Sequence, residues 1–280
     1  MKRSWRLILD GKHDGYYNMA VDEAILLNYS KERKPTLRIY GWKYPFITLG
    51  YNQIPEHVLK AASKIPFVRR ITGGAAILHH EELTYSLICA VSDINLPQKV
   101  KESFKHLSSF LVEFYSQLGL EAGFAQDFLS GTLSENMGRL GEYGNFCFSS
   151  CEHYDLLIEG KKIGGNAQKR RKGIIFQQGS IPQAVDVDLV GRNIRDVEKI
   201  NTKITYLNEL LKISISFAEL QVLLSKSFQQ TFDLELQKGK LTDQEESLAK
   251  ILANNKYEDE HWNIKRQARN IDSNCFSVRS

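Results

Sequence analysis

The sequence has few cysteines, few prolines and no long apolar run. Its 280 residues include 4 cysteines and 6 prolines, which argues against a disulfide scaffold, a collagen-like repeat and a proline-rich disordered chain. No run of about 18 apolar residues occurs, so no membrane-spanning helix is expected. The N-terminus has only a short apolar run and no small-residue cleavage site, which is unlike a signal peptide. We therefore expect a cytoplasmic protein with reduced thiols.

Charge of one sign is also scarce. Lys and Arg total 37 against 33 for Asp and Glu, a formal net charge of +4. So small an excess predicts no nucleic-acid partner unless it gathers in a patch. Four basic residues do lie together at 169–172. They form either a solvated turn or a patch that faces an acidic protein partner.

What is present is a globular composition, with 42% hydrophobic residues. Short apolar runs between turn residues predict strands at 5–9, 36–40, 46–50, 67–71, 75–79, 83–91, 121–124, 154–158, 162–168 and 174–181. Asn18 is the expected N-cap of a helix, and apolar spacings predict another helix from 97 to 118. Ser216 with Glu219 and Thr242 with Glu245 have capping-box spacing.

These patterns predict an α+β fold, with mixed or antiparallel sheets flanked by helices. We expect one catalytic domain over residues 1–280. Within it, a sheet-rich core covers about 1–200, a helical part about 206–266 and a tail 267–280. The polar segment 130–145 has neither the helical nor the strand periodicity of apolar residues, and it is predicted to be a long loop.

The first segment that could carry chemistry is RRITGG with the histidine that follows it. Gly73 and Gly74 would let the backbone approach a ligand, and Arg69 and Arg70 offer forked donors for a carboxylate or phosphate. A tight turn with exposed arginines is the alternative. His79, near an apolar run, is by itself more typical of a hydrogen-bonded core residue than of a catalyst.

The second segment is GKKIGGNAQ. Lys162 leads into Gly164 and Gly165 within a predicted strand, where glycine is unfavourable unless something packs against the backbone. A lysine there could donate a hydrogen bond to a carbonyl or carboxylate. The alternative is a hairpin turn with solvated lysines. We expect Lys162→Ala to leave the fold intact, since replacing a hairpin lysine should cost little stability.

The third segment surrounds Cys147, at the end of the polar segment and just before a predicted strand. A nearby cation would make this thiol a nucleophile. An inert buried thiol is one alternative, and a metal cluster of Cys147, Cys151 and His153 is another. That spacing supplies at most three ligands, with no fourth nearby. Cys89 stands in an apolar run and is expected in the core.

The order of these motifs resembles the biotin/lipoate protein ligase superfamily. Within it, the chain resembles the cysteine-dependent octanoyltransferases of the type found in Gram-positive bacteria. Those enzymes move an octanoyl group from acyl carrier protein to a lipoyl-accepting protein. The resemblance covers nearly the whole chain and rests on NMAVDEA (18–24), LGYNQ (49–53), RRITGG (69–74), AILH (76–79), ELTYS (82–86), CF (147–148), YDL (154–156), GKKIGGNAQKR (160–170), QQGSI (177–181) and YEDEHWNIKR (257–266).

The resemblance implies roles for individual residues. Cys147 matches the nucleophile that receives the acyl chain as a thioester, and Lys162 matches the lysine that contacts the acyl carbonyl. The substrate-binding residues that it implies are Arg70, Gly73, Gly74, His79, Gly164, Gly165 and Gln168. Backbone N–H groups of either double glycine are candidate oxyanion donors.

The implied reaction needs no cofactor, because the donor thioester is already activated. The implied partners are octanoyl-acyl carrier protein as donor and a lipoyl-domain protein as acceptor, either the glycine cleavage H protein or a 2-oxoacid dehydrogenase E2. Three departures from the family pattern stand out. Cys151 replaces a common proline, Gln178 a common histidine, and Asn52 a common aromatic residue. The last two leave the acyl chain preference open.

Other functions remain open at this point. An ATP-dependent lipoate–protein ligase would use Lys162 and need no cysteine. Because the sequence ends soon after its helical part, we do not expect the usual ligase accessory domain, although some ligases carry that domain on a separate chain. An amidotransferase that moves octanoyl or lipoyl groups between lipoyl-domain proteins would use the same cysteine. A non-catalytic binder of lipoyl domains would need neither Cys147 nor Lys162.

Overall fold

A sheet with two buried faces organises the computed structural model, which describes residues 3–97, 99–129, 146–147, 152–197 and 200–268. Neighbours such as Leu87 and Ile88 point to opposite faces of a strand and so contribute to two different cores. The strand order is β10-β11-β6-β2-β1-β12. β1 is parallel to both its neighbours, and the other pairs are antiparallel. The strands are β1 (Arg3–His13), β2 (Thr36–Trp42), β6 (Glu82–Ala90), β10 (Gly165–Arg171), β11 (Ile174–Pro182) and β12 (Leu234–Lys238).

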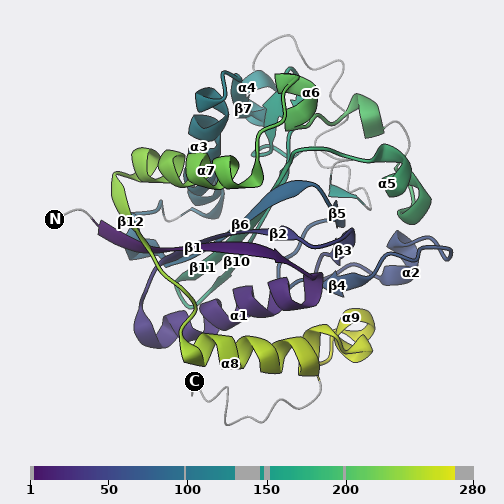
Figure 1. Cartoon of the computed structure of the whole chain (residues 1–280), viewed down its shortest axis with the longest axis horizontal. Coiled ribbons are helices and arrows are strands. Elements are labelled where there is room, and N and C mark those ends of the chain that lie inside the picture. Colours follow the sequence, from purple (N-terminus) through teal and green to yellow (C-terminus); the bar gives the residue numbers. More distant parts are fainter. Residues whose placement is uncertain (1–2, 98, 130–145, 148–151, 198–199, 269–280) are drawn as a thin grey trace.

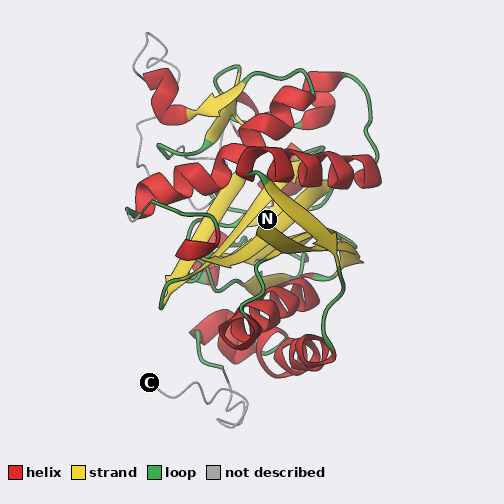
Figure 2. Cartoon of the chain, turned by 90° about the vertical axis from the view of Figure 1, so that its left-hand side faces the viewer, coloured by secondary structure: helices red, strands yellow, loops and turns green. Residues whose placement is uncertain are grey.

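Helices cover both faces of this sheet (Figures 1 and 2). α3 (Val100–Gln117) and α7 (Phe217–Phe232) pack on one face, around Phe110 and Phe228. α1 (Gly15–Glu32) and α8 (Asp243–Leu252) pack on the other. The helix predicted from 97 to 118 is confirmed as α3. Both capping boxes are also confirmed, at the starts of α7 and α8.

Two smaller sheets lie beside the large one. One has the order β4-β3-β5 and the other β7-β8-β9. Their strands are β3 (Phe46–Leu49), β4 (Phe67–Arg69), β5 (Ile77–His79), β7 (Ala122–Phe124), β8 (Leu156–Ile158) and β9 (Lys161–Lys162). The remaining helical segments are α2 (Pro55–Val58), η1 (Val91–Asp93), α4 (Ala125–Leu129), α5 (Val187–Asn193), η3 (Ile200–Thr202), α6 (Leu207–Leu211), η4 (Ala253–Tyr257) and α9 (Glu260–Lys265).

Two local predictions are wrong. α1 begins at Gly15 and is capped by Asp14, not Asn18. Asn18 lies inside the helix and is buried. Its side chain accepts a hydrogen bond from the buried Arg38 and donates one to the Gly41 carbonyl. The part predicted as helical from 206 to 266 also contains β12, which pairs in parallel with β1 and so extends the central sheet.

The α+β architecture, with mixed and antiparallel sheets flanked by helices, is confirmed. Cys89 is fully buried in the core, as predicted. Among the described residues, no helix has both the length and the apolar character that crossing a membrane requires. The segment 130–145, predicted as a loop, lies outside the described residues.

Candidate active site

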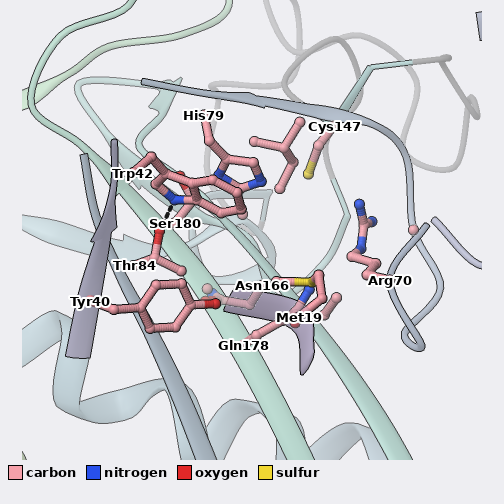
Figure 3. A pocket seen from close by; sticks show the side chains of 15 residues that line it. Met19, Tyr40, Trp42, Arg70, His79, Thr84, Cys147, Asn166, Gln178 and Ser180 are labelled. Carbon is pink, nitrogen blue, oxygen red and sulfur yellow. Dashed lines mark hydrogen bonds between the residues drawn. The ribbon is translucent and has the colours of Figure 1, made fainter. Parts of the chain in front are cut away.

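A cavity between the central sheet and β5 has Cys147 in its wall (Figure 3). α1 contributes Met19, β2 contributes Trp42 and β5 contributes Ile77, so much of the lining is apolar. The complete lining consists of Met19, Tyr40, Trp42, Arg70, Gly74, Ile77, His79, Thr84, Cys147, Gly165, Asn166, Ala167, Gln178, Gly179 and Ser180. Of the predicted site residues, the cavity brings together Cys147, Arg70, Gly74, His79 and Gly165.

Cys147 is held in place through its backbone. The preceding residue, Phe146, is buried and forms a parallel bridge with Ala76. The Cys147 N–H donates to the Ala76 carbonyl over 2.8 Å. A Cβ on Gly165 would lie 2.6 Å from the Cys147 Sγ. The glycine that the sequence analysis singled out is therefore the residue that makes room for the sulfur.

Lys162 reaches Cys147 from β9. Its Nζ lies 3.8 Å from the Cys147 Sγ and donates to the Cys147 carbonyl oxygen over 2.8 Å. The same ammonium forms an ion pair with Asp155 at 2.6 Å. Lys162 is 4% exposed and Asp155 is 6% exposed. The alternative of a solvated hairpin lysine is therefore wrong.

His79 is a fixed part of the cavity wall. Its ring stacks on Trp42, with centroids 3.9 Å apart. One ring nitrogen, Nδ1, is 2.8 Å from the Glu82 Oε1, and the other, Nε2, is 2.8 Å from the Thr48 Oγ1. Glu82 also accepts a hydrogen bond from Ser180. Because both ring nitrogens have hydrogen-bond partners, the His79 ring is fixed in the cavity wall. This agrees with the prediction of a hydrogen-bonded core histidine.

The guanidinium groups of the two arginines of RRITGG donate hydrogen bonds within the protein, so they are not free forked donors for a ligand. The Arg70 Nη2 donates to the Gly73 and Ala75 carbonyls, each over 2.7 Å, and its Nη1 donates to Thr48. Arg69 donates to carbonyls of the 50–53 loop and of α9. Both are buried, so the alternative of exposed arginines is wrong, and so is their interpretation as forked donors.

Arg70 nevertheless contributes charge to the cavity. Burial lowers the pKa of its guanidinium to about 10, and the proximity of Cys147 acts in the opposite direction. Among the described residues, no carboxylate forms an ion pair with Arg70, whereas Lys162 is paired with Asp155. In Figure 3 Arg70 and Cys147 lie on the same side of the cavity. The guanidinium is therefore a second cation on the cysteine side.

The two double glycines occupy different positions. Gly74 lines the cavity, and both Gly73 and Gly74 line an adjoining groove. In the part of the chain that the structure describes, neither of their N–H groups has an acceptor. Gly164 has a φ of 120° and packs against the Ser180 carbonyl. Within the described residues, the Gly73 and Gly74 N–H groups therefore remain available as hydrogen-bond donors.

The basic cluster at 169–172 is divided by the strand that carries it. The Lys169 Nζ lies 5.6 Å from the centre of the Tyr51 ring, on one side of β10. Arg170 points to the other side, where its Nη2 donates to the Val100 carbonyl at the start of α3. Successive side chains of a strand alternate between faces, so these residues do not form a single patch.

A metal site has no support among the described residues, which contain no group of three His, Cys, Asp or Glu that could hold an ion. Cys151, one member of the cluster considered above, lies outside the described residues.

Comparison with known proteins identifies the family. Residues 14–229 match the model of the lipoyl protein ligase A/B catalytic domain. The chain belongs to this family. It is 36% identical to the octanoyltransferase LipM of Anoxybacillus flavithermus, over 95% of this chain and 99% of that protein. It is 32% identical to the octanoyltransferase LipM of Bacillus subtilis, over the same shares.

The solved structures that resemble this member of the lipoyl protein ligase A/B family include ligases. A lipoate protein ligase of Thermoplasma acidophilum with bound lipoic acid has a TM-score of 0.75 and 24% identity, over 93% of this chain and 99% of that one. Lipoate-protein ligase A bound with ATP also has a TM-score of 0.75 and 24% identity, over 93% and 98%. At these identities the likeness supports the fold alone.

Asp155 is the site residue that the sequence analysis missed. Its Oδ2 accepts hydrogen bonds from Lys162 and from the Glu152 N–H, the latter over 2.8 Å. The family motif YDL contains this aspartate, so a signal existed. A separation of seven residues does not by itself predict an ion pair between Asp155 and Lys162. The antiparallel pairing of β8 with β9 brings the two side chains together.

Two of the three departures from the family pattern, Gln178 and Asn52, lie within the described residues and have different surroundings. Gln178 lines the cavity, and its Nε2 donates to the Thr72 hydroxyl over 3.2 Å. Asn52 is exposed on a turn and is not part of the cavity lining. Gln168 lies in the adjoining groove, where it bonds Gln177 and Arg170. Of the two departures, only Gln178 can therefore contact an acyl chain directly.

Proposed function

We propose that this protein is an octanoyltransferase. It moves an octanoyl group from acyl carrier protein to the lipoyl-accepting lysine of a lipoyl-domain protein, through a thioester on Cys147. The proposal is carried by the position of Cys147 in the wall of a largely apolar cavity, with the Lys162 ammonium 3.8 Å from its sulfur. The relatives named octanoyltransferase support the same assignment.

In the first half-reaction, the Cys147 thiolate attacks the carbonyl carbon of the donor thioester. The new carbon–sulfur bond forms and the carbonyl electrons move to oxygen, which gives a tetrahedral oxyanion. The Lys162 ammonium, 3.8 Å from the Cys147 Sγ, is the donor that stabilises this negative charge, and the backbone N–H groups of Gly73 and Gly74 are further candidate donors. The bond to the donor sulfur then breaks, and the pantetheine thiolate leaves and takes up a proton.

In the second half-reaction, the neutral amine of the acceptor lysine attacks the acyl-Cys147 carbonyl. An amide bond forms, the bond to the Cys147 sulfur breaks, and the amine nitrogen loses a proton. The cysteine returns to its thiolate form. A thioester is replaced by a more stable amide, so neither ATP nor a metal ion takes part. The apolar wall, with Met19, Trp42 and Ile77, is where the octanoyl chain lies.

The test is acylation without ATP. The protein is incubated with octanoyl-acyl carrier protein, and its intact mass is measured before and after hydroxylamine treatment. We expect an octanoyl adduct that hydroxylamine removes and that a Cys147→Ala variant lacks. Cys89→Ala is the matched control and keeps the adduct, because Cys89 is fully buried in the core. Absence of an adduct on the unchanged protein would overturn the proposal.

The same assay separates the two remaining activities. Loading of free lipoate that requires ATP and survives Cys147→Ala would identify a ligase. An adduct that forms only from an octanoylated lipoyl domain, and not from the carrier protein, would identify an amidotransferase. A lipoyl-domain binder would produce no adduct from either donor.

A further inference from the structure

A groove adjoins the cavity and shares part of its wall. We call it the β10 groove, and the residues that line it but not the cavity are Gly73, Val100, Phe104, Gln168 and Arg170. Gly74, Asn166 and Ala167 line both the cavity and the groove, so the two are contiguous. A ligand whose reactive end meets Cys147 can therefore extend into the β10 groove.

One face of β10 presents a row of polar side chains along this groove. Asn166, Gln168 and Arg170 are two residues apart and thus share a face. The Asn166 Oδ1 accepts from the Tyr85 hydroxyl, and within the described residues its Nδ2 has no acceptor. The Gln168 Oε1 accepts from the Arg170 Nε over 2.7 Å. The row thus consists of two amides followed by a guanidinium.

The positive charge of Arg170 has no carboxylate partner in the part of the chain that the structure describes. Its Nε and Nη2 are directed to Gln168 and to the Val100 carbonyl. Among the described residues no carboxylate forms an ion pair with it, although Lys99 and Lys105 of the neighbouring segment both have one. A partly buried guanidinium held in this way is suited to a phosphate group.

The length of the row matches that of a pantetheine arm. Gly165 borders the Cys147 sulfur, and five residues of extended strand lead from it to Arg170, a distance of about 17 Å. A phosphopantetheine arm has about 13 bonds from phosphorus to sulfur. Extended, with about 1.25 Å of advance per bond, it spans roughly 16 Å.

We propose that the β10 groove binds the phosphopantetheine arm of the acyl donor, with its phosphate on Arg170 and its amides beside Gln168 and Asn166. This proposal rests on the proposed function and names its donor site. The acceptor is the less suitable occupant, because a lysine side chain is shorter than the groove and brings a positive charge toward Arg170.

The experiment compares two small donors that differ only in the phosphate. Acylation of Cys147 is timed with octanoyl-phosphopantetheine and with octanoyl-pantetheine, by intact mass. We expect the unchanged protein to react faster with the phosphorylated donor, by roughly 10- to 100-fold in kcat/KM. Arg170→Met should remove most of this preference, because it should slow the reaction with octanoyl-phosphopantetheine far more than the reaction with octanoyl-pantetheine.

Two further variants make the result decisive. Arg171→Met removes the same charge from the exposed neighbouring residue and should keep the preference. Val100→Glu places a carboxylate at the groove rim on a residue that is 60% exposed, so it should fold and should weaken the preference. Equal rates with both donors, or a preference that survives Arg170→Met and Val100→Glu, would overturn the donor site. No acylation by either donor, or by the carrier protein, would instead overturn the proposed function.

Discussion

The two double-glycine segments near Cys147 are alike in sequence and differ in their surroundings. A Cβ on Gly165 would lie 2.6 Å from the Cys147 Sγ, and one on Gly164 would overlap the Ser180 carbonyl oxygen. A Cβ on Gly74 would meet only the Arg70 Nη2, at 3.0 Å, and one on Gly73 would meet nothing within 4 Å. One pair is packed against the protein, whereas the other faces space that a ligand can fill.

This difference indicates why glycine stands in each place. At Gly164-Gly165 a side chain is excluded by atoms of the fold and by the nucleophile. At Gly73-Gly74 the N–H groups have no acceptor among the described residues and the groove is open, which points to a role in contact with substrate. Substitutions should therefore damage the packed segment more than the open one.

The largest effect is expected at the ion pair that precedes the packed segment. Lys162→Ala leaves the buried Asp155 without its partner, so the variant should lose about 3 kcal/mol in free energy of unfolding. It should also lose transfer activity. A solvated hairpin lysine would cost little stability when replaced, but Lys162 is buried, so a larger cost is expected. Urea unfolding followed by circular dichroism measures the loss.

A double variant tests the cause of that loss. Lys162→Ala combined with Asp155→Ala removes both charges and should be more stable than Lys162→Ala alone. If the double variant is the less stable one, burial of an unpaired carboxylate is not the reason.

Gly165→Ala comes next, because its methyl group must displace the Cys147 sulfur. A nucleophile moved by about 1 Å reacts roughly 100-fold more slowly, so we expect a loss of that size in the acylation rate. Acylation by octanoyl-acyl carrier protein is timed by intact mass. In a Cys147→Ala background the same methyl group should cost less stability, since the sulfur is absent. A normal acylation rate would contradict the packed geometry.

Gly164→Ala should reduce stability more than chemistry. Its φ of 120° is strained for any residue with a Cβ, and the added carbon would push against the Ser180 carbonyl. We expect a cost of about 2 kcal/mol in unfolding free energy. Because Gly164 does not line the cavity, the folded fraction should still be acylated on Cys147. A variant that is stable and inactive would reverse this assignment.

Much of the fold follows from local sequence patterns. The spacing of apolar residues predicted α3, and two capping boxes predicted the starts of α7 and α8. β12 escaped detection because it is a short, polar edge strand that is stabilised by pairing with β1 at the opposite end of the chain. Asn18 was misplaced as a cap because its true role, bonding a buried arginine, depends on tertiary contacts.

In the candidate site, too, some features follow from the sequence motifs and others depend on tertiary contacts. Motif order pointed to Cys147 and Lys162, and the structure brings them within 3.8 Å. The pairing of Lys162 with Asp155 could not be deduced, since it requires the β8-β9 hairpin. The hydrogen bonds from Arg70 to the Gly73 and Ala75 carbonyls could not be deduced either. A sequence does not show which side-chain donors bond to the backbone in the folded protein.

Gly74→Ala should have a modest effect. Its φ of 87° favours glycine, and the new Cβ would lie 3.0 Å from the Arg70 Nη2, which can shift slightly. We expect a loss of about 1 kcal/mol in unfolding free energy and an acylation rate within severalfold of normal. A loss as large as that of Gly164→Ala would show that the two segments are equally constrained.

Gly73→Ala should have the smallest effect, because a Cβ there would have no neighbour within 4 Å. The substitution also keeps the backbone N–H, so an oxyanion donor at this position survives it. We therefore expect an unfolding free energy within about 0.5 kcal/mol of normal and an unchanged acylation rate with octanoyl-pantetheine. A slower reaction confined to octanoyl-acyl carrier protein would mean that the methyl group obstructs the donor, which would place the donor against this residue in the β10 groove. A loss with both donors would instead mean that Gly73 is held by the fold, and the contrast between the two segments would fail.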